Sequence, residues 1–223
     1  RERTEQLERA NRELVEQSFR DPLTGLRNRR FLIESMDEDV AAVDRAYFES
    51  AERAEKDEEG LVFAMVDLDH FKAVNDSYGH VAGDRVLVQV SAILKSVARQ
   101  TDSVVRWGGE EFLLVARGGG PDSAAALAAR IRKAFRTHAF DLGESITLRL
   151  TCSIGFACYP FVPTDGTRLD WEEVVGVADK ALYAAKRSGR DAWVGVGYTA
   201  RTPDVNLFKL IRADAGGLVA SGE

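Results

Sequence analysis

Two aspartates stand at the end of a short apolar run, where their spacing could hold a cation. Residues 61–66 are continuously apolar, which predicts a central strand buried on both faces, and Asp67, Leu68 and Asp69 follow. Successive strand residues point to opposite faces, so Asp67 and Asp69 share one face. The carboxyl end of a strand is a common place for a site. The alternative is that Asp69 caps a helix that starts just after it.

A second pair of acids follows a glycine turn. Residues 103–107 and 111–116 form two short apolar runs, and Gly108-Gly109 between them predicts a hairpin. Glu110 and Glu111 come directly after the turn. Adjacent like charges raise each other's pKa or require a cation. If this hairpin pairs beside the Asp67 strand, the carboxylates converge into a ligand set for Mg²⁺ or Mn²⁺ with phosphate oxygens as further ligands.

The remaining elements must position these acids. Residues 1–19 form a polar helix whose heptad positions favour either a parallel coiled coil or a solvated helix end, and residues 28–57 predict a second helix. Further helices are expected over 86–97, after Pro121 and over 171–185, with strands over 146–156 and 191–196. The order β-α-β-β-α-β-α-β predicts an α+β or split-βαβ sheet with helices on one side. The heptad positions are Thr4, Leu7, Asn11, Leu14 and Ser18.

Composition excludes several classes of protein. The chain has 223 residues, a formal charge of −6, 45% hydrophobic and 30% charged residues, so it is neither disordered throughout nor basic enough to coat a nucleic-acid polymer. No apolar run reaches the roughly 18 residues of a membrane span. Cys152 and Cys158 lie about 20 Å apart along one predicted strand, too far for a disulfide, and are expected to be reduced.

The glycine turn belongs to a longer set of motifs. The string 108–112, GGEEF, resembles the signature of the GGDEF family of diguanylate cyclases in its GGEEF form. Further matches run in order along the chain: DPLTGLRNRR at 21–30, DLDHFK at 67–72 with Asn75-Asp76, YGHVAGD at 78–84, SIG at 153–155, and ADKALYAAK at 178–186 with Gly189-Arg190.

The resemblance implies a fold and a reaction. The fold is α+β, like nucleotidyl cyclases and polymerase palm domains, with a central, mainly antiparallel sheet, a βαββαβ core and flanking helices. By this resemblance, two GTP would condense into cyclic di-GMP and release two pyrophosphates. Asp67, the Leu68 carbonyl and Glu110 would bind two Mg²⁺ or Mn²⁺ ions. Glu110 or a metal-bound hydroxide would take the proton of the ribose 3′-hydroxyl, and Glu111 would act as a further catalytic or metal contact.

The resemblance also implies how GTP is held. Asn75 and Asp84 would read the guanine edge and favour GTP over ATP, because an amide and a carboxylate match its donors and acceptors. Taken alone, Asn75 is equally a turn residue and Asp84 a helix cap. The residues expected to contact the phosphates or line the substrate are Phe71, Lys72, His80, Lys186 and Arg190. The chain has no GxxxxGK[ST] string, so this site is not a P-loop. Lys186 and Arg190 also fit a positively charged helix C-terminus.

A regulatory site is implied as well. Arg99 and Asp102 form an RxxD pattern nine residues before Gly108, the spacing of the family's product-inhibition site. Arginine can bind the guanine O6 and N7 atoms together, and a carboxylate can orient it. The alternative is a salt bridge at a helix end.

These inferences divide the chain into three parts. Residues 1–20 would be the end of a signalling or coiled-coil helix, 21–196 the catalytic domain, and 197–223 an unassigned tail. Because the chain opens on Arg1, we expect an upstream sensor domain. The expected partners are GTP, cyclic di-GMP and a second copy of the chain, since each subunit holds one GTP. A cytoplasmic location without membrane contact is expected. Two other functions stay open, a non-catalytic nucleotide-binding module and a structural dimerisation domain.

Overall fold

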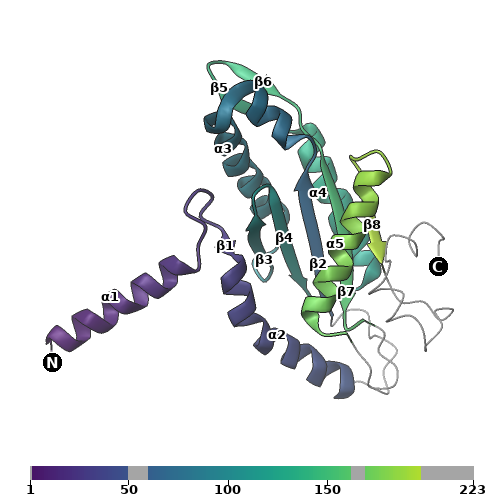
Figure 1. The fold of residues 1–223 in the computed structure, drawn as a ribbon. Helices are drawn as coiled ribbons and strands as arrows, with labels where there is room; N and C mark the ends of the chain where they lie inside the picture. The colour runs from purple at the N-terminus through teal and green to yellow at the C-terminus, as the bar shows by residue number, and fades with distance from the viewer. Residues whose placement is uncertain (1, 50–59, 162–168, 197–223) are drawn as a thin grey trace.

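A computed structural model of the chain describes residues 2–49, 60–161 and 169–196 (Figure 1). The predicted helical residues 50–57 and the 197–223 tail lie outside this described part. The helices are α1 (Glu2–Ser18), α2 (Arg29–Glu49), α3 (Phe71–Val97), α4 (Pro121–Thr137) and α5 (Trp171–Arg187). The strands are β1 (Arg27–Asn28), β2 (Leu61–Leu68), β3 (Ser103–Gly108), β4 (Glu111–Arg117), β5 (Phe140–Gly143), β6 (Ile146–Leu148), β7 (Cys152–Tyr159) and β8 (Trp193–Val196).

Six strands form the central sheet in the order β1-β3-β4-β2-β7-β8. The four inner strands pair antiparallel, and the short edge strands β1 and β8 pair parallel with β3 and β7. Strand β2 lies inside the sheet and is buried along its whole length, as its continuous apolar run predicts. The mainly antiparallel α+β sheet with flanking helices is therefore confirmed.

Helices cover both faces of the sheet, so the expectation of helices on one side is wrong. Phe63 and Met65 of β2 pack with residues of α2 and α5, whereas Val62 and Val66 pack with residues of α3 and α4. Figure 1 shows α5 in front of the sheet and α4 behind it. A strand that is apolar at every position has two faces to bury, and each needs its own helical layer. At Gly155 of β7, an added Cβ would collide with the α5 backbone, so this glycine lets the helix approach closely.

The prediction of a single strand over 146–156 is also wrong, because residues 149–151 are not in a strand and separate β6 from β7. Strand β6 pairs with β5, which the sequence did not indicate, in a separate two-stranded sheet, and β7 begins only at Cys152. Thr151 is turned toward the end of β2, where its carbonyl accepts from the Asp69 amide at 3.0 Å. Cys152 and Cys158 both lie in β7 and are free thiols, as expected.

Helix α3 is two helical segments joined at Gly79. This residue has φ 79° and ψ 165°, outside the helical region and on the side of φ that glycine adopts without a steric penalty. The kink separates the first turns of α3, next to β2, from the longer apolar segment that packs on the sheet.

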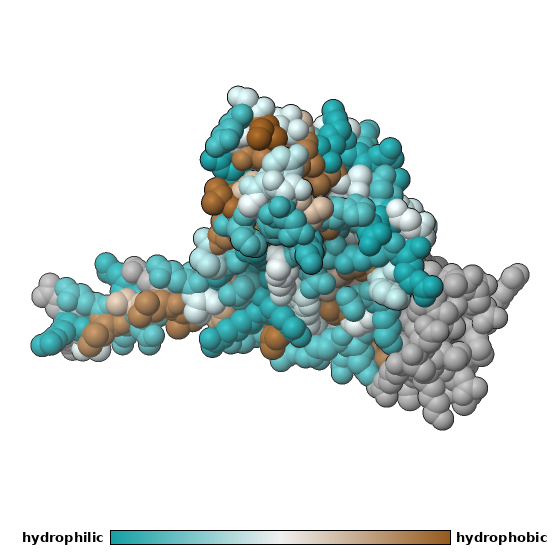
Figure 2. All heavy atoms as spheres, turned by 45° about the horizontal axis from the view of Figure 1, so that its top comes forward, coloured by the Kyte–Doolittle hydropathy of each residue, from teal (hydrophilic) through white to brown (hydrophobic). Residues whose placement is uncertain are grey.

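Helix α1 extends away from the sheet, and its apolar side chains are open to solvent. Leu7 and Leu14 are 66% and 65% exposed. Figure 2 shows a row of hydrophobic residues along this arm. An isolated helix of 17 residues is only marginally stable in water, and a second helix could cover the exposed stripe. The coiled coil stays a prediction. In the part of the chain that the structure describes, no helix is both long and apolar enough to span a bilayer.

Candidate active site

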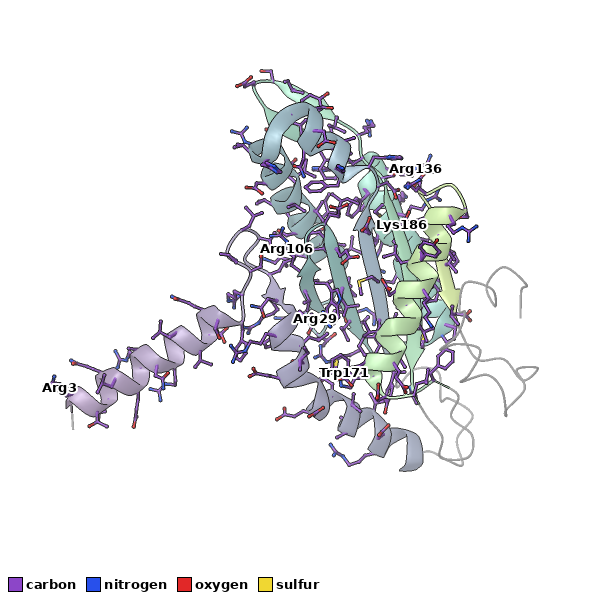
Figure 3. The ribbon with its side chains drawn as sticks, in the orientation of Figure 1. Arg3, Arg29, Arg106, Arg136, Trp171 and Lys186 are labelled. Carbon is purple, nitrogen blue, oxygen red and sulfur yellow. The ribbon has the colours of Figure 1, made fainter. Side chains whose placement is uncertain are left out.

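Asp67 lies at the C-terminal end of β2, between two neighbouring strands. It is 4% exposed and stands opposite Glu111 of β4 and Ser153 of β7. The glycine hairpin therefore does pair beside the Asp67 strand. Lys186 reaches from the last turn of α5 and places its Nζ 2.8 Å from Asp67 Oδ2 (Figure 3). This contact decides against a purely helix-dipole role for Lys186.

The β3–β4 hairpin presents Glu110 at its tip. Strand β3 ends at Gly108 and β4 begins at Glu111, so Gly109, at φ 45°, and Glu110 form the two-residue loop. Arg106 holds this loop. Its guanidinium donates to the Gly109 carbonyl at 3.1 and 2.8 Å and to both oxygens of Asp21 at 3.0 and 3.1 Å. Arg106 thereby joins the hairpin to the turn that follows α1.

The sequence did not single out Arg106 or Asp21 as functional. The two residues are 85 positions apart, and no periodicity or motif spacing links them. The available signal is that each adjoins a turn, Asp21 before Pro22 and Arg106 before the glycine pair. Such a pairing becomes visible only when the sheet brings the two turns together.

The three carboxylates near the end of β2 repel one another. Burial, followed by the charge of Asp67, raises the pKa values of Glu110 and Glu111. Burial also raises the pKa of Asp67, although Lys186 opposes this effect. Packed carboxylates with raised pKa values are relieved by a cation. Hard oxygen donors of this kind suit Mg²⁺ or Mn²⁺, so the donor set fits the implied metals.

The implied ligand set contains two carboxylates and one backbone carbonyl, from Asp67, Glu110 and Leu68. Among the described residues, no group of three or more His, Cys, Asp or Glu side chains is arranged to hold a metal. The two findings are compatible, because Mg²⁺ takes one or two carboxylates and completes its shell with water and phosphate oxygens.

A cavity of about 470 Å³ opens in front of these acids, within the roughly 300–1,000 Å³ range of small-molecule sites. Helix α3 starts at its wall, where His70 has φ 60° and makes no side-chain capping bond. A helix N-terminus with open N–H groups suits a phosphate. The predicted site residues that line the cavity are Asp67, Leu68, Phe71, Lys72, Glu110, Lys186 and Arg190. Four residues that were not predicted as site residues also line it: Asp69, His70, Ala73 and Asp76.

The predicted guanine readers and His80 do not line this cavity. Asn75 and Asp84 lie within α3, on either side of the kink, so neither the turn nor the cap alternative describes them. The kink brings Asn75 against Gly83, where an added Cβ would collide with the Asn75 Oδ1 atom. Asn75 therefore lies beside Gly83, the residue before Asp84, although Asn75 and Gly83 are eight positions apart in the sequence.

Asp69 is a structural carboxylate, not a helix cap. It is 3% exposed and accepts from Thr151 Oγ1 at 2.6 Å, from Ser153 Oγ at 2.7 Å and from the Asp191 amide at 2.9 Å. The N-cap position of α3 belongs to His70. Asp69 thus joins β2, β7 and the turn after α5, and the capping alternative is wrong.

The turn after α5, which carries Arg190 into the cavity wall, is held by a second ion pair. Arg190 and Asp191 have φ 66° and 43°, a left-handed conformation that non-glycine residues rarely adopt. The Asp191 carboxylate accepts from Arg132 of α4 at 2.9 and 3.1 Å. This pair was not predicted, since an arginine on a helix is ordinary surface composition.

Arg99 and Asp102 lie at a separate pocket, between the end of α3 and β3. The Asp102 carboxylate accepts from the Arg99 backbone amide at 2.7 Å. Among the described residues, no ion pair joins the two side chains. The structure therefore gives Asp102 a role in fixing the turn, where the sequence suggested that it orients the guanidinium.

Comparisons with known proteins agree with this arrangement. The family model described as "Diguanylate cyclase, GGDEF domain" matches residues 18–192. Diguanylate cyclase DgcP of Pseudomonas aeruginosa is 37% identical over 177 residues, which are 79% of this chain and 24% of that protein. The chain thus spans about a quarter of the length of this relative.

Two solved structures are similar in sequence and fold. Diguanylate cyclase SiaD of Pseudomonas aeruginosa, in complex with its activator SiaC, is 38% identical with a TM-score of 0.68, over 87% of this chain and 68% of that one. The coiled coil and GGDEF domain of DgcB from Caulobacter crescentus, in complex with c-di-GMP, is 27% identical with a TM-score of 0.71, over 87% and 94%. The extent of the family match, together with the buried Asp67 beside a glycine hairpin, places this chain in the GGDEF-domain family of diguanylate cyclases.

Proposed function

We propose that this domain condenses two GTP molecules into cyclic di-GMP with release of two pyrophosphates. The observation that carries the proposal is the cavity at the end of β2, where acids and cations meet. Asp67 and Glu110 line this cavity together with Lys72, Lys186 and Arg190. Acids suited to a divalent metal beside cations suited to phosphates form a site for a metal–triphosphate pair.

Within this proposal, Asp67, the Leu68 carbonyl and Glu110 hold two Mg²⁺ or Mn²⁺ ions. When bound, such ions lower the pKa of the attacking hydroxyl and stabilise the leaving pyrophosphate. Glu110, on the hairpin tip, receives the proton of the ribose 3′-hydroxyl in this proposal. Arg106 positions Glu110 by holding the Gly109 carbonyl. Glu111, the cross-strand partner of Asp67, is a further catalytic or metal contact.

The cations and the start of α3 bind the rest of the nucleotide. Phe71 and Lys72 contact the phosphates at the helix N-terminus, and Lys186 and Arg190 bind the β- and γ-phosphates. Asn75 and Asp84 read guanine, with His80 nearby on α3. Their proximity across the Gly79 kink supports this pairing. A site built to satisfy the polar edge of guanine should reject ATP strongly.

Catalysis requires a second copy of the chain, because each site holds one GTP and the bond forms between two. Bringing two loaded sites face to face supplies the proximity of an intramolecular reaction. The exposed apolar stripe of α1 supports such pairing through a parallel coiled coil. We accordingly assign residues 1–20 to a signalling helix and residues 21–196 to the catalytic domain. We propose that the signalling helix connects to an upstream sensor domain. We also propose a cytoplasmic location, and the acidic net charge argues against binding to nucleic-acid polymers.

The test is chromatography of the products formed from GTP and Mg²⁺. The dimeric protein should yield cyclic di-GMP, and Glu110→Gln should abolish it while keeping the fold. The matched control is Glu34→Gln, which changes an exposed glutamate on α2 and should retain full turnover. Nucleotide binding without any cyclic or linear product would support the alternative of a non-catalytic binding module. Dimers that bind no nucleotide would support a structural dimerisation domain.

We also propose that Arg99 and Asp102 form a product-inhibition site. Support comes from their position at a pocket away from the catalytic cavity and from the unpaired state of the Arg99 guanidinium within the described residues. Arg99→Ala should abolish high-affinity binding of cyclic di-GMP and spare synthesis. Product affinity equal to that of the wild type would contradict this site.

A further inference from the structure

The Arg99 pocket has a second wall, formed by the segment that follows α1. The cavity measures about 190 Å³, below the roughly 300–1,000 Å³ of pockets that enclose a whole ligand of this size, so it would hold part of a cyclic dinucleotide. Lys95 and Arg99 line it from the α3 side, and Arg20 and Arg27 line it from the other. The charges of these side chains are therefore four positive against the single acid Asp102.

The cations on the two walls differ in what they contact. Within the described part of the chain, Lys95 and Arg99 form no ion pair. Arg20 and Arg27 share one acceptor, Glu16 Oε1 in the last turn of α1, at 3.2 and 2.6 Å. The hydrogen bond from Arg27 is the main reason that the pKa of Glu16 lies below its usual value. One carboxylate of α1 thus pairs with both arginines of the wall that faces Arg99 and offsets one of their two positive charges.

A cyclic dinucleotide carries the chemistry that would replace this carboxylate. Each phosphodiester is an anion, and arginine binds phosphate oxygens and the guanine O6–N7 edge in the same forked geometry that it uses for a carboxylate. The Glu16 side chain is about half exposed, and ion pairs at such a site are weak. A bound phosphate could therefore replace Glu16 as the partner of these arginines.

We propose that Arg20 and Arg27 belong to the cyclic di-GMP site and that Glu16 of α1 competes with the bound product for them. The inference rests on the proposed product site at Arg99 and extends it to the N-terminal helix. Product binding removes the two Glu16 ion pairs between the last turn of α1 and the loop at 20–27, and a change in α1 that withdraws Glu16 exposes two arginines to product. By thermodynamic linkage, each event favours the other.

The test measures cyclic di-GMP affinity by calorimetry at fixed salt. Glu16→Gln should bind product about two- to fivefold more tightly than the wild type, because a weak competing ion pair has been removed. Arg20→Ala should weaken binding by about tenfold, the effect of losing one charge-assisted contact. Glu34→Gln removes a comparable exposed pair, Arg30–Glu34 at 2.9 Å, whose residues do not line this pocket, and should leave the affinity unchanged.

Two failures can be distinguished. If Arg99→Ala leaves product affinity unchanged, the proposed product site itself is wrong. If Arg99→Ala abolishes binding while Glu16→Gln binds no more tightly than the wild type, only the competition by Glu16 is wrong. Hydrogen exchange gives a second readout that does not depend on either arginine variant. Saturating product should speed exchange in the last turn of α1, and unchanged exchange would overturn the proposal.

Discussion

Asp67 and Asp69 lie two residues apart and are both buried, yet their substitution should have opposite consequences. Asp69→Ala removes the acceptor of three hydrogen bonds, from Thr151, Ser153 and the Asp191 amide. A hydrogen bond to a charged group contributes about 1.5–3 kcal/mol. Since the three share one carboxylate and are not additive, we expect a loss of about 3–5 kcal/mol in the free energy of unfolding. That is a large part of the roughly 5–15 kcal/mol typical of a domain.

Asp67→Ala should cost little stability. Burial raises the pKa of Asp67 even with Lys186 beside it, so folding disfavours its ionised form at neutral pH. Removing that charge offsets the loss of the ion pair to Lys186, whose side chain is 31% exposed and so keeps contact with water, and the expected change is within about 1 kcal/mol. The same substitution should abolish cyclic di-GMP synthesis, because it removes a proposed metal ligand.

The assay is urea unfolding followed by circular dichroism, at neutral pH with a chelator, for both variants and the wild type. Ser153→Ala is an intermediate control, since it removes a single donor to the charged Asp69 and should cost about 1.5–3 kcal/mol. A loss for Asp67→Ala that equals or exceeds the loss for Asp69→Ala would refute the division of roles between the two aspartates.

Three further predictions concern charge and burial. Burial acts to raise the pKa of Asp21, but hydrogen bonds from Thr24 and Arg106 outweigh it, so the net pKa is below 3.8. The stabilisation is therefore present above pH 3.8 and lost as pH falls through the folded pKa. Asp21→Asn should flatten the acid limb of a stability–pH curve, and an unchanged limb would contradict this. Burial raises the pKa of Cys152 well above its usual range, so maleimide at pH 8 should label it only after unfolding, as mass spectrometry can show. Lys186→Met frees Asp67, so Mn²⁺ should bind the nucleotide-free protein more tightly in an electron paramagnetic resonance titration; weaker binding would count against Lys186 as the resting counter-ion.

Much of the fold was predictable from local pattern. The run over 61–66 identified β2 because burial on both faces requires an uninterrupted apolar strand, and the glycine pair identified the β3–β4 turn. The break at 149–151 was not predictable, because alternation continues through it. What ends the pairing there is the contact between Thr151 and Asp69, 82 residues away along the chain.

The site divides in the same way. Asp67 and the hairpin acids were identified because acids at the end of an apolar strand or beside a tight turn are unusual. The residues that hold them, Arg106 and Asp69, were missed or misread, because their partners are distant in sequence and their residue types are common. Beyond a place beside a turn, positioning residues of this kind carry no local signature, and only tertiary structure shows their partners.

Arg106 has a consequence for building chimeric proteins from this domain. Its guanidinium touches the turn after α1 on one side and the hairpin that bears Glu110 on the other. A different helix fused upstream should therefore join before residue 16, so that the segment 16–28 stays intact and keeps both Glu16 and Asp21. A junction placed after Asp21 would leave Arg106 with one anchor, and the hairpin would lose its alignment even though every residue of the cavity had been retained.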